Sequence, residues 1–583
     1  MHRIQNLPGK FQVENLNKFV FGEADGKDDP LLETCALVIS PVKEFLDENK
    51  SILVGDRGAG KTAVFRLLSE RKIKFVNREN LKQVYIPIDE DLGYKTLREH
   101  VIAQIKDPTS QSSAQHRIVW ELYIFSRCLD GLKESFSGNQ AFEQIRDSFY
   151  DISGWKSQRK VGLLDLLVNT KKSFGVKLEG GHLGHVVPNF YTSVEPKSAA
   201  DDLLLQTSYI DLPRLKGELN SLLSKSKCVS YVLIDKLDEF VSDVEYQTQL
   251  ETLQALLHCW RDYQSYPKIK IKLFLRRDLY ERLDFSSIGK DKIDPRKVDL
   301  KWTAEDIRQL MASRIFHNLA PVLRGKALRF ECNEEVLKID RAFLREIRAI
   351  DSMPESEKSV GARLRRAILM IRAKIRQRKR DEYDARTTNL HDLVNRAVIT
   401  VIFPRSVSHQ NRSNKTEQIE IAHFIETHFQ LSNEGTTPRS VLLFMQKGLE
   451  IARNYYSSNP EKEIAQNEKG EYPVFLRDHL CEAYNEIRRL SLQTIIGLHH
   501  QWSRPATLLM QAIQGSKTPD QIQFRDAKKV IGKALGDKTN DALASFFAFY
   551  EHAGLFRCIN RTQNLEARVY SVPIFFQRVL INS

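Results

Sequence analysis

The segment that decides the fold spans residues 51–68 and reads SILVGDRGAGKTAVFRLL. From Gly55 to Thr62 it matches the pattern G-x-x-x-x-G-K-[ST], with an apolar run before it and a helix-like run after it. Glycines let the backbone turn so that successive N–H groups point at phosphate oxygens, and the helix that follows adds the positive end of its dipole. The segment predicts a phosphate loop between a buried strand and a helix. The competing interpretation is a glycine-rich turn without a ligand.

The pattern also assigns roles within the loop. Lys61 is expected to reach the β- and γ-phosphates, and the Thr62 hydroxyl is expected to ligand Mg²⁺. The other loop residues would hold phosphate oxygens through their backbone; they are Gly55, Asp56, Arg57, Gly58, Ala59 and Gly60. The predicted cofactors are therefore ATP and Mg²⁺.

A second apolar run, at residues 229–234, ends in Asp235. A carboxylate at the end of such a strand would hold Mg²⁺ through water. Asp238 and Glu239 follow about one turn later, and either could orient or deprotonate the attacking water. The choice between these two acids stays open, and the alternative is a buried strand that ends in a solvated acidic turn.

Apolar strands are expected near residues 52, 86, 232, 272 and 298, and helical patterns alternate with them. This alternation is typical of an α/β fold with a parallel sheet, here five-stranded. Before the sheet, Asp29 and Pro30 suggest the cap and first residue of a helix that runs to about Glu48.

Changes in pattern along the chain divide it into five regions. They are an N-terminal segment with its lead-in helix (1–50), a P-loop NTPase core (51–302) with a helical and β-hairpin insertion at about 95–210, a helical lid (303–456), a linker (457–473) and a winged-helix-like domain (474–583). In the last region, residues 540–552 take the position of a recognition helix. No Lys or Arg occurs from 539 to 556, which favours a structural or protein-binding role over the reading of DNA.

Composition excludes several classes. The chain has 583 residues, of which 42% are hydrophobic and 28% charged, and no run approaches the roughly 18 apolar residues of a membrane span. Its seven cysteines are scattered without C-x-x-C, which argues against zinc and disulfides, and no signal peptide is apparent. We therefore expect a cytoplasmic protein without membrane contact. The net charge of +13 would suit a polyanionic partner.

Residues 361–380 carry nine cations and no acid. An apolar stripe recurs at helical spacing within them, at Leu364, Ile368, Ile371 and Ile375. Three interpretations stay open for the basic face: a solvated surface of a lid helix, a contact with nucleic acid, or an acidic partner or subunit interface.

The chain resembles bacterial P-loop ATPases of the AAA+/STAND type, close to KAP-like and defence-associated members. The resemblance covers roughly residues 15–455 and rests on Phe21-Gly22-Glu-Ala-Asp, Gly55-Asp-Arg-Gly-Ala-Gly-Lys-Thr62, Leu233-Ile-Asp-Lys-Leu-Asp-Glu239, Phe274-Leu-Arg-Arg-Asp-Leu-Tyr280, Val298-Asp-Leu-Lys-Trp302 with Arg314, and Thr436-Thr-Pro-Arg439. It implies a polar sensor at the end of the fourth strand, here Arg276 or Arg277. It also implies a lid arginine near the γ-phosphate, here Arg439, whereas ordinary ion pairs are the alternative for all three arginines.

This resemblance implies an ATP-binding and ATP-hydrolysing molecular switch in a bacterial antiviral defence or conflict system, acting as a homo-oligomer with an effector protein. In many AAA+ proteins the catalytic glutamate directly follows the metal-binding aspartate, but here Lys236 has that position. Slow, switch-like hydrolysis is therefore favoured over rapid turnover. The alternatives are an ATPase that remodels nucleic acid through residues 361–380, and a nucleotide-dependent scaffold with little hydrolysis.

Overall fold

The structure, a computed structural model, describes residues 2–5, 10–11, 16–76, 81–89, 110–151, 211–237, 246–285, 289–322, 328–332, 335–339, 390–410, 416–430, 436–465, 472, 474–498, 500–515, 520–535 and 540–577. The chain divides into two compact units. The sheet unit comprises Glu44–Gly55 and Val64–Leu300. The lid unit comprises Met1–Lys43, Asp56–Ala63 and Lys301–Ser583, so that it includes the phosphate loop.

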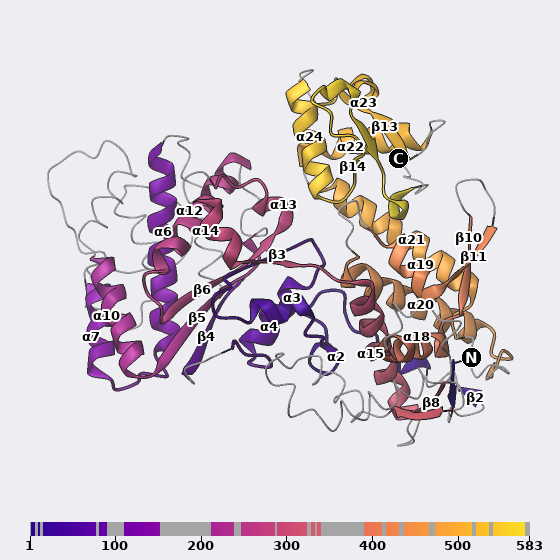
Figure 1. Ribbon diagram of the computed structural model, residues 1–583, viewed down its shortest axis with the longest axis horizontal. Helices are drawn as coiled ribbons and strands as arrows, with labels where there is room; N and C mark the ends of the chain where they lie inside the picture. The colour runs from indigo at the N-terminus through magenta and orange to yellow at the C-terminus, as the bar shows by residue number, and fades with distance from the viewer. Residues whose placement is uncertain are drawn as a thin grey trace, which may run out of the picture. The chain divides into compact units, whose positions relative to one another are not determined.

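The sheet unit contains the parallel five-stranded sheet that the sequence predicts. Its strands are β3 (Ile52–Gly55), β4 (Lys82–Ile88), β5 (Cys228–Ile234), β6 (Ile269–Arg276) and β7 (Lys297–Leu300). They lie in the order β4-β5-β6-β3-β7, and every pairing is parallel (Figure 1). The carboxyl ends of the strands therefore share one edge, and β6 separates the strand before the phosphate loop from the strand before Asp235.

Helices cover this sheet because its strands are apolar on both faces; all seven residues of β5 are buried. The covering helices include α6 (Ser110–Leu132), α7 (Gln140–Asp151), α10 (Leu212–Lys225) and α12 (Tyr246–Tyr263). Helix α6 packs against α12 and against β4 and β5. Trp120 of α6 donates its indole N–H to the carbonyl of Thr252 in α12 at 3.0 Å, so the buried polar edge of that ring is satisfied.

The lead-in helix predicted from Pro30 to about Glu48 is wrong. Two short helices, α2 (Leu32–Cys35) and α3 (Ser40–Phe45), form instead. The chain leaves α2 at Ala36 with extended angles (φ −61°, ψ 138°). Pro41 follows, and inside one long helix it would remove a backbone hydrogen bond and clash with the preceding turn. The carboxylate of Asp29, expected as a cap, accepts from the Leu31 N–H at 3.0 Å and also forms an ion pair with Arg314.

The lid region contains four described helices, but also strand ladders that the sequence analysis missed. The helices are α15 (Ala304–Val322), α18 (Leu390–Ile402), α19 (Ile421–His428) and α20 (Pro438–Ser458). The ladders join β1 (His2–Gln5), β8 (Leu328–Cys332) and β9 (Glu335–Ile339), and separately β10 (Ser406–Gln410) and β11 (Thr416–Glu420). The alternation of LRFEC at residues 328–332 has the period of two that signals a strand.

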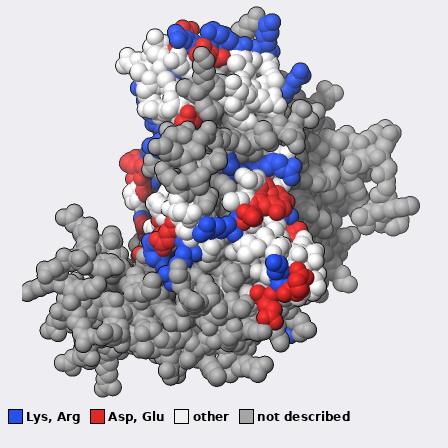
Figure 2. Space-filling view, turned by 90° about the vertical axis from the view of Figure 1, so that its right-hand side faces the viewer, with Lys and Arg blue, Asp and Glu red and all other residues white. Residues whose placement is uncertain are grey.

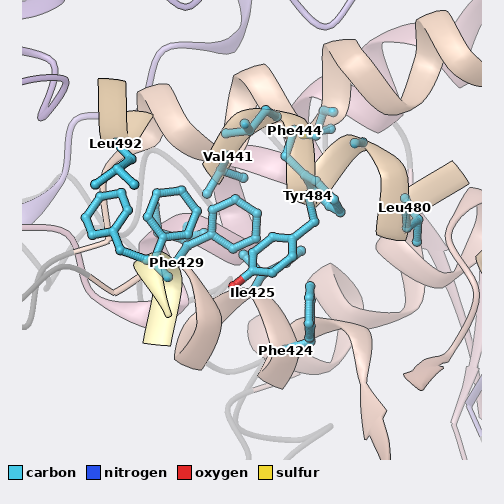
Figure 3. Packing of buried hydrophobic residues seen from close by; sticks show 14 of the residues in the cluster. Phe424, Ile425, Phe429, Val441, Phe444, Leu480, Tyr484 and Leu492 are labelled. Atoms are coloured by element: carbon cyan, nitrogen blue, oxygen red, sulfur yellow. The ribbon is translucent and has the colours of Figure 1, made fainter. Parts of the chain in front are cut away.

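One apolar core joins the lid helices to α21 (Arg477–Ile496). Figure 3 shows Phe429, Phe444 and Tyr484 turned toward one another within it. The Phe429 and Phe444 rings lie 5.2 Å apart in an edge-to-face arrangement, and the Tyr484 hydroxyl donates to the carbonyl of His428 at 3.0 Å. Helix α21 is thus fixed to the lid by side-chain packing and by a buried hydrogen bond.

The C-terminal region forms a winged-helix-like domain. Helices α22 (His500–Gln514), α23 (Phe524–Ile531) and α24 (Asn540–His552) accompany an antiparallel sheet of β13 (Gln521–Gln523), β15 (Val569–Ser571) and β14 (Arg557–Cys558). Helix α24 has the bounds predicted for the recognition position, whereas β13 was not foreseen. In the predicted linker, β12 (Ile464–Ala465) pairs with β2 (Lys10–Phe11), and Ile464 and Tyr472 are buried. The region boundaries themselves stay predictions.

Charge does not separate into large single-sign areas on the described surface that Figure 2 shows, where acidic and basic side chains are interspersed. The basic segment 361–380 and the glycine-rich insertion around residues 173–187 lie outside the described residues. Their interpretations stay predictions. Within the described ranges, no helix combines the length and apolarity that crossing a bilayer requires.

Candidate functional site

The phosphate loop occupies the turn between β3 and α4 (Lys61–Ser69). Gly58 and Gly60 adopt positive φ angles of +79° and +94°, a region that only glycine enters readily. The Ala59 N–H donates to the carbonyl of Asp56 at 3.1 Å and closes the turn. Two of the glycines in the motif are therefore required by the backbone path itself.

Lys61 is the first residue of α4, and its side chain is almost buried, with 9% exposed. Its ammonium group donates to the Asp56 carbonyl at 3.0 Å and so spans the loop. Thr62, the second residue of the helix, is half-buried. The predicted phosphate and metal groups thus lie in the first turn of the helix, where the dipole favours an anion.

Two further residues of the lid unit contact the loop. Trp302 donates its indole N–H to the carbonyl of Ala59 at 2.8 Å. The backbone N–H of Arg439 approaches the carbonyl of Gly58 at 3.4 Å. A Cβ at Gly58 would lie only 2.7 Å from the Cβ of Arg439, so this glycine is also needed for the close approach of the lid.

Arg439 lies in the first turn of α20, where Thr437 caps the helix by accepting from the Ser440 N–H at 3.5 Å. The aliphatic part of its side chain runs along Gly58. Arg439 is half-buried, and none of its partners among the described residues is an acid or a side-chain acceptor. The structure therefore places the stem of Arg439 on the phosphate loop, and the expected role of its guanidinium stays a prediction.

Asp235 lies at the carboxyl edge of the sheet, directly after β5. It is 2% exposed, and its backbone N–H donates to the carbonyl of Ile88 in β4 at 3.0 Å, which fixes the residue to the sheet. Lys236 then takes a positive φ of +58°, so the chain turns sharply away from the strand direction. Asp238 and Glu239 lie outside the described residues.

The two arginines at the end of β6 both hold carboxylates. Arg276 forms a two-point ion pair with Asp278, with Nε–Oδ1 at 2.9 Å and Nη2–Oδ2 at 2.6 Å. Arg277 donates to Asp299 of β7 at 2.9 Å. Burial alone would raise the pKa of Asp299, but the hydrogen bond from Lys297 and the charge of Arg277 outweigh it and lower that pKa.

Sheet register brings Arg276 to the phosphate motif. Arg276 is the Cα partner of Gly55, the first residue of the motif, across the β3–β6 ladder. The last residue of β6, the fourth strand of this sheet along the chain, therefore lies beside the residue at which the phosphate loop begins. The sequence analysis named both Arg276 and Gly55. It quoted Trp302 without giving it a role, although its position shortly after the last strand of the sheet could have drawn attention to it.

No protein-family model matches this chain, and no curated protein matches it. Among solved structures, it is similar to the Orc1 protein of Aeropyrum pernix in complex with DNA, with 11% identity, 90% of this chain and 83% of that chain covered, and a TM-score of 0.29. It is also similar to Cdc6p from Pyrobaculum aerophilum, with 11% identity, 97% and 96% coverage, and a TM-score of 0.24. Similarity at these scores supports no conclusion, so the fold assignment rests on the sheet order and the phosphate loop.

Proposed function

We propose that this chain is a P-loop ATPase that binds MgATP at residues 55–62 and hydrolyses it. The observation that carries the proposal is the geometry of the loop. Gly58 and Gly60 have the positive φ angles that a phosphate cradle needs, and Lys61 opens a helix at its rim. Along the chain the loop directly follows β3, as Asp235 directly follows β5.

Residues of the two motifs have the chemistry that a magnesium–nucleotide complex needs. Thr62 offers a hydroxyl and Asp235 a carboxylate, and Mg²⁺ prefers such oxygen ligands. A bound Mg²⁺ would neutralise phosphate charge. Lys61 would bind the β- and γ-phosphates, the loop N–H groups would orient them, and Asp238 or Glu239 would accept the proton of the attacking water.

Among the candidate arginines, the contacts favour Arg439 as the group that reads the γ-phosphate. Arg276 is engaged on two sides by Asp278, and Arg277 is engaged by Asp299, so either would have to exchange a carboxylate for a phosphate. Among the described residues Arg439 contacts no carboxylate that it would have to release, and its stem already lies on Gly58. In this proposal Arg276 acts as a sensor only after Asp278 releases it.

For the biological role we propose a slow molecular switch, in a bacterial antiviral defence or conflict system and in a homo-oligomer that acts on an effector protein. Lys236 supports slow hydrolysis, because it occupies the position directly after Asp235 where many AAA+ proteins have the catalytic glutamate. The role in defence rests on the resemblance of the sequence motifs to AAA+/STAND ATPases. An ATPase that remodels nucleic acid and a scaffold with little hydrolysis are the competing proposals.

Substitution of the acids near the carboxyl edge tests the proposed hydrolysis. Glu239→Gln or Asp238→Asn should leave MgATP bound and slow single-turnover hydrolysis by about 100-fold, the scale of a lost general base. Asp235→Asn should instead weaken the dependence of ATP binding on Mg²⁺, because it removes the carboxylate that would face the metal. Phosphate release and calorimetry with and without EDTA measure these effects, and GTP is compared in the same assays.

Asp526→Asn is the matched control, because this exposed acid on α23 pairs with Lys529 at the surface. It should leave turnover unchanged. Parent-level turnover in both Glu239→Gln and Asp238→Asn would show that the water-activating group lies elsewhere. Absence of single-turnover hydrolysis in the parent would favour the scaffold, and stimulation by DNA or RNA would favour the remodelling ATPase.

A further inference from the structure

Trp302 contacts the phosphate loop through the polar edge of its ring. It follows β7 by two residues and precedes α15. Its indole N–H donates to the carbonyl of Ala59 at 2.8 Å, and its ring would lie 3.9 Å from a Cβ at Gly60. The proposed ATPase chemistry has no role for this residue.

The hydrogen bond fixes the orientation of one peptide group in the loop. A trans peptide is planar, so the carbonyl of Ala59 and the N–H of Gly60 point in opposite directions. With the Ala59 carbonyl held by Trp302, the Gly60 N–H is directed away from the indole. Backbone N–H groups of such a glycine-rich turn are the donors for phosphate oxygens.

The lid unit also contacts the neighbouring peptide group of the loop, between Gly58 and Ala59. The Arg439 N–H lies 3.4 Å from the Gly58 carbonyl, a weaker contact than the one from Trp302. Two consecutive carbonyls of the loop are thus contacted by the residue after β7 and by the first turn of α20. The shape of the phosphate cradle therefore depends on lid-unit groups outside the motif.

Packing alone does not explain this arrangement. The Trp302 ring is partly buried against the apolar core of the lid unit, and an apolar side chain would fill such a position without any donor. The indole N–H is instead aimed at a backbone carbonyl of the loop, at a length typical of a good hydrogen bond. The inference therefore rests on the indole N–H of Trp302 and not on the packing of its ring.

We propose that Trp302 is a positioning residue that presets the phosphate loop for the phosphates of a nucleoside triphosphate. The proposal rests on the proposed function, since it concerns the same loop. Because the hydrogen bond supports the loop whether ground state or transition state is bound, its loss should weaken nucleotide binding more than it slows the bound complex.

The test compares Trp302→Phe with the parent, using MgATP and MgADP in calorimetry and MgATP in single-turnover hydrolysis. Loss of one net hydrogen bond predicts a Kd for MgATP that is about 3- to 10-fold higher. The rate at saturating MgATP should change less than the Kd does. The thermal midpoint without nucleotide should stay close to that of the parent, because the donor meets a loop and not the core.

Trp502→Phe is the matched control. Trp502 lies in α22 and packs on Phe546 and Phe549, with ring centroids at 5.9 and 5.5 Å. It should bind MgATP as the parent does. Should Trp302→Phe fail to fold, replacement of the Trp302 indole by benzothiophene removes only the N–H and keeps the ring shape, and the same rise in Kd is expected.

The outcomes separate this proposal from the function on which it rests. If the parent does not bind MgATP, or if Lys61→Ala binds it equally well, both proposals fail. If the parent binds and Lys61→Ala does not, but the Kd of Trp302→Phe equals that of the parent, only the positioning role is overturned. An equal rise in Kd for Trp502→Phe would also overturn it, because the effect would then be general to loss of an indole.

Discussion

Replacement of Lys61 by alanine is expected to abolish ATP hydrolysis and to weaken MgATP binding. The loop has this one side-chain ammonium at the start of α4, where it spans the turn to the Asp56 carbonyl at 3.0 Å. A hydrogen bond to a charged phosphate contributes about 1.5–3 kcal/mol, so the Kd should rise by roughly 10- to 150-fold. Calorimetry and phosphate release measure the two effects.

The fold should survive this substitution, because the Lys61 ammonium bonds the loop and not the apolar core. Unchanged thermal unfolding would establish this point. Lys533→Ala is the control, since Lys533 is exposed after α23 and should bind MgATP like the parent. Turnover and affinity of Lys61→Ala equal to those of the parent would refute the assignment of residues 55–62 as the nucleotide site.

The sheet and the phosphate loop could be predicted because their signals are local. Five apolar runs bounded by breakers gave the strands, and positive φ angles at Gly58 and Gly60 follow from the residue type that the motif demands. The parallel order was also expected, since helices alternate with the strands. The position of β6 between β3 and β5 was not, because strand order depends on contacts between distant segments.

What the sequence could not show was which partner each charged residue has. Arg276 and Arg277 looked equivalent as sensors, but the first is held by Asp278 and the second by Asp299 of the next strand. Asp29 looked like a helix cap because it precedes a proline. It does accept from the nearby Leu31 N–H, but its charged partner, Arg314, lies 285 residues further along the chain. Local spacing contains no information on such a pair.

The role of Trp302 was hidden for a similar reason. Its position after a strand suggests packing, and an aromatic ring in such a place ordinarily fills a core. In the folded chain its N–H donates to the Ala59 carbonyl, 243 residues away in sequence. Residues that orient a motif from outside it have no sequence pattern of their own. Sequence analysis therefore finds the motif but not the residues that hold it in place.

Asp29 and Arg314 form an ion pair in which both side chains are buried. We expect it to stabilise the fold more than the other ion pairs among the described residues. Each side chain is 3% exposed, and the guanidinium meets the carboxylate at two points, 2.9 Å for Nη1–Oδ1 and 2.5 Å for Nη2–Oδ2. Asp29 also accepts from the Leu31 N–H at 3.0 Å. Gly22, with φ +85°, lies so close that any Cβ there would overlap both partners.

Arg314→Met is therefore expected to lower the free energy of unfolding of the lid unit by about 3–5 kcal/mol, because it leaves the Asp29 carboxylate buried without its counter-charge. Guanidinium unfolding followed by fluorescence measures the loss. Arg561→Met is the matched control: the Arg561 side chain is 80% exposed beside Glu551, and such a surface pair contributes at most about 1 kcal/mol.

A double variant, Asp29→Leu with Arg314→Met, distinguishes a lost pair from lost packing. If the cost of Arg314→Met comes from the stranded carboxylate, removal of Asp29 as well should restore part of the stability, and the two single losses should sum to more than the double loss. Strict additivity would contradict this expectation, because it would mean that the two side chains act independently. The pair would then stabilise the lid unit only through the volume of its side chains, and its charges would contribute nothing to holding residues 16–29 against α15.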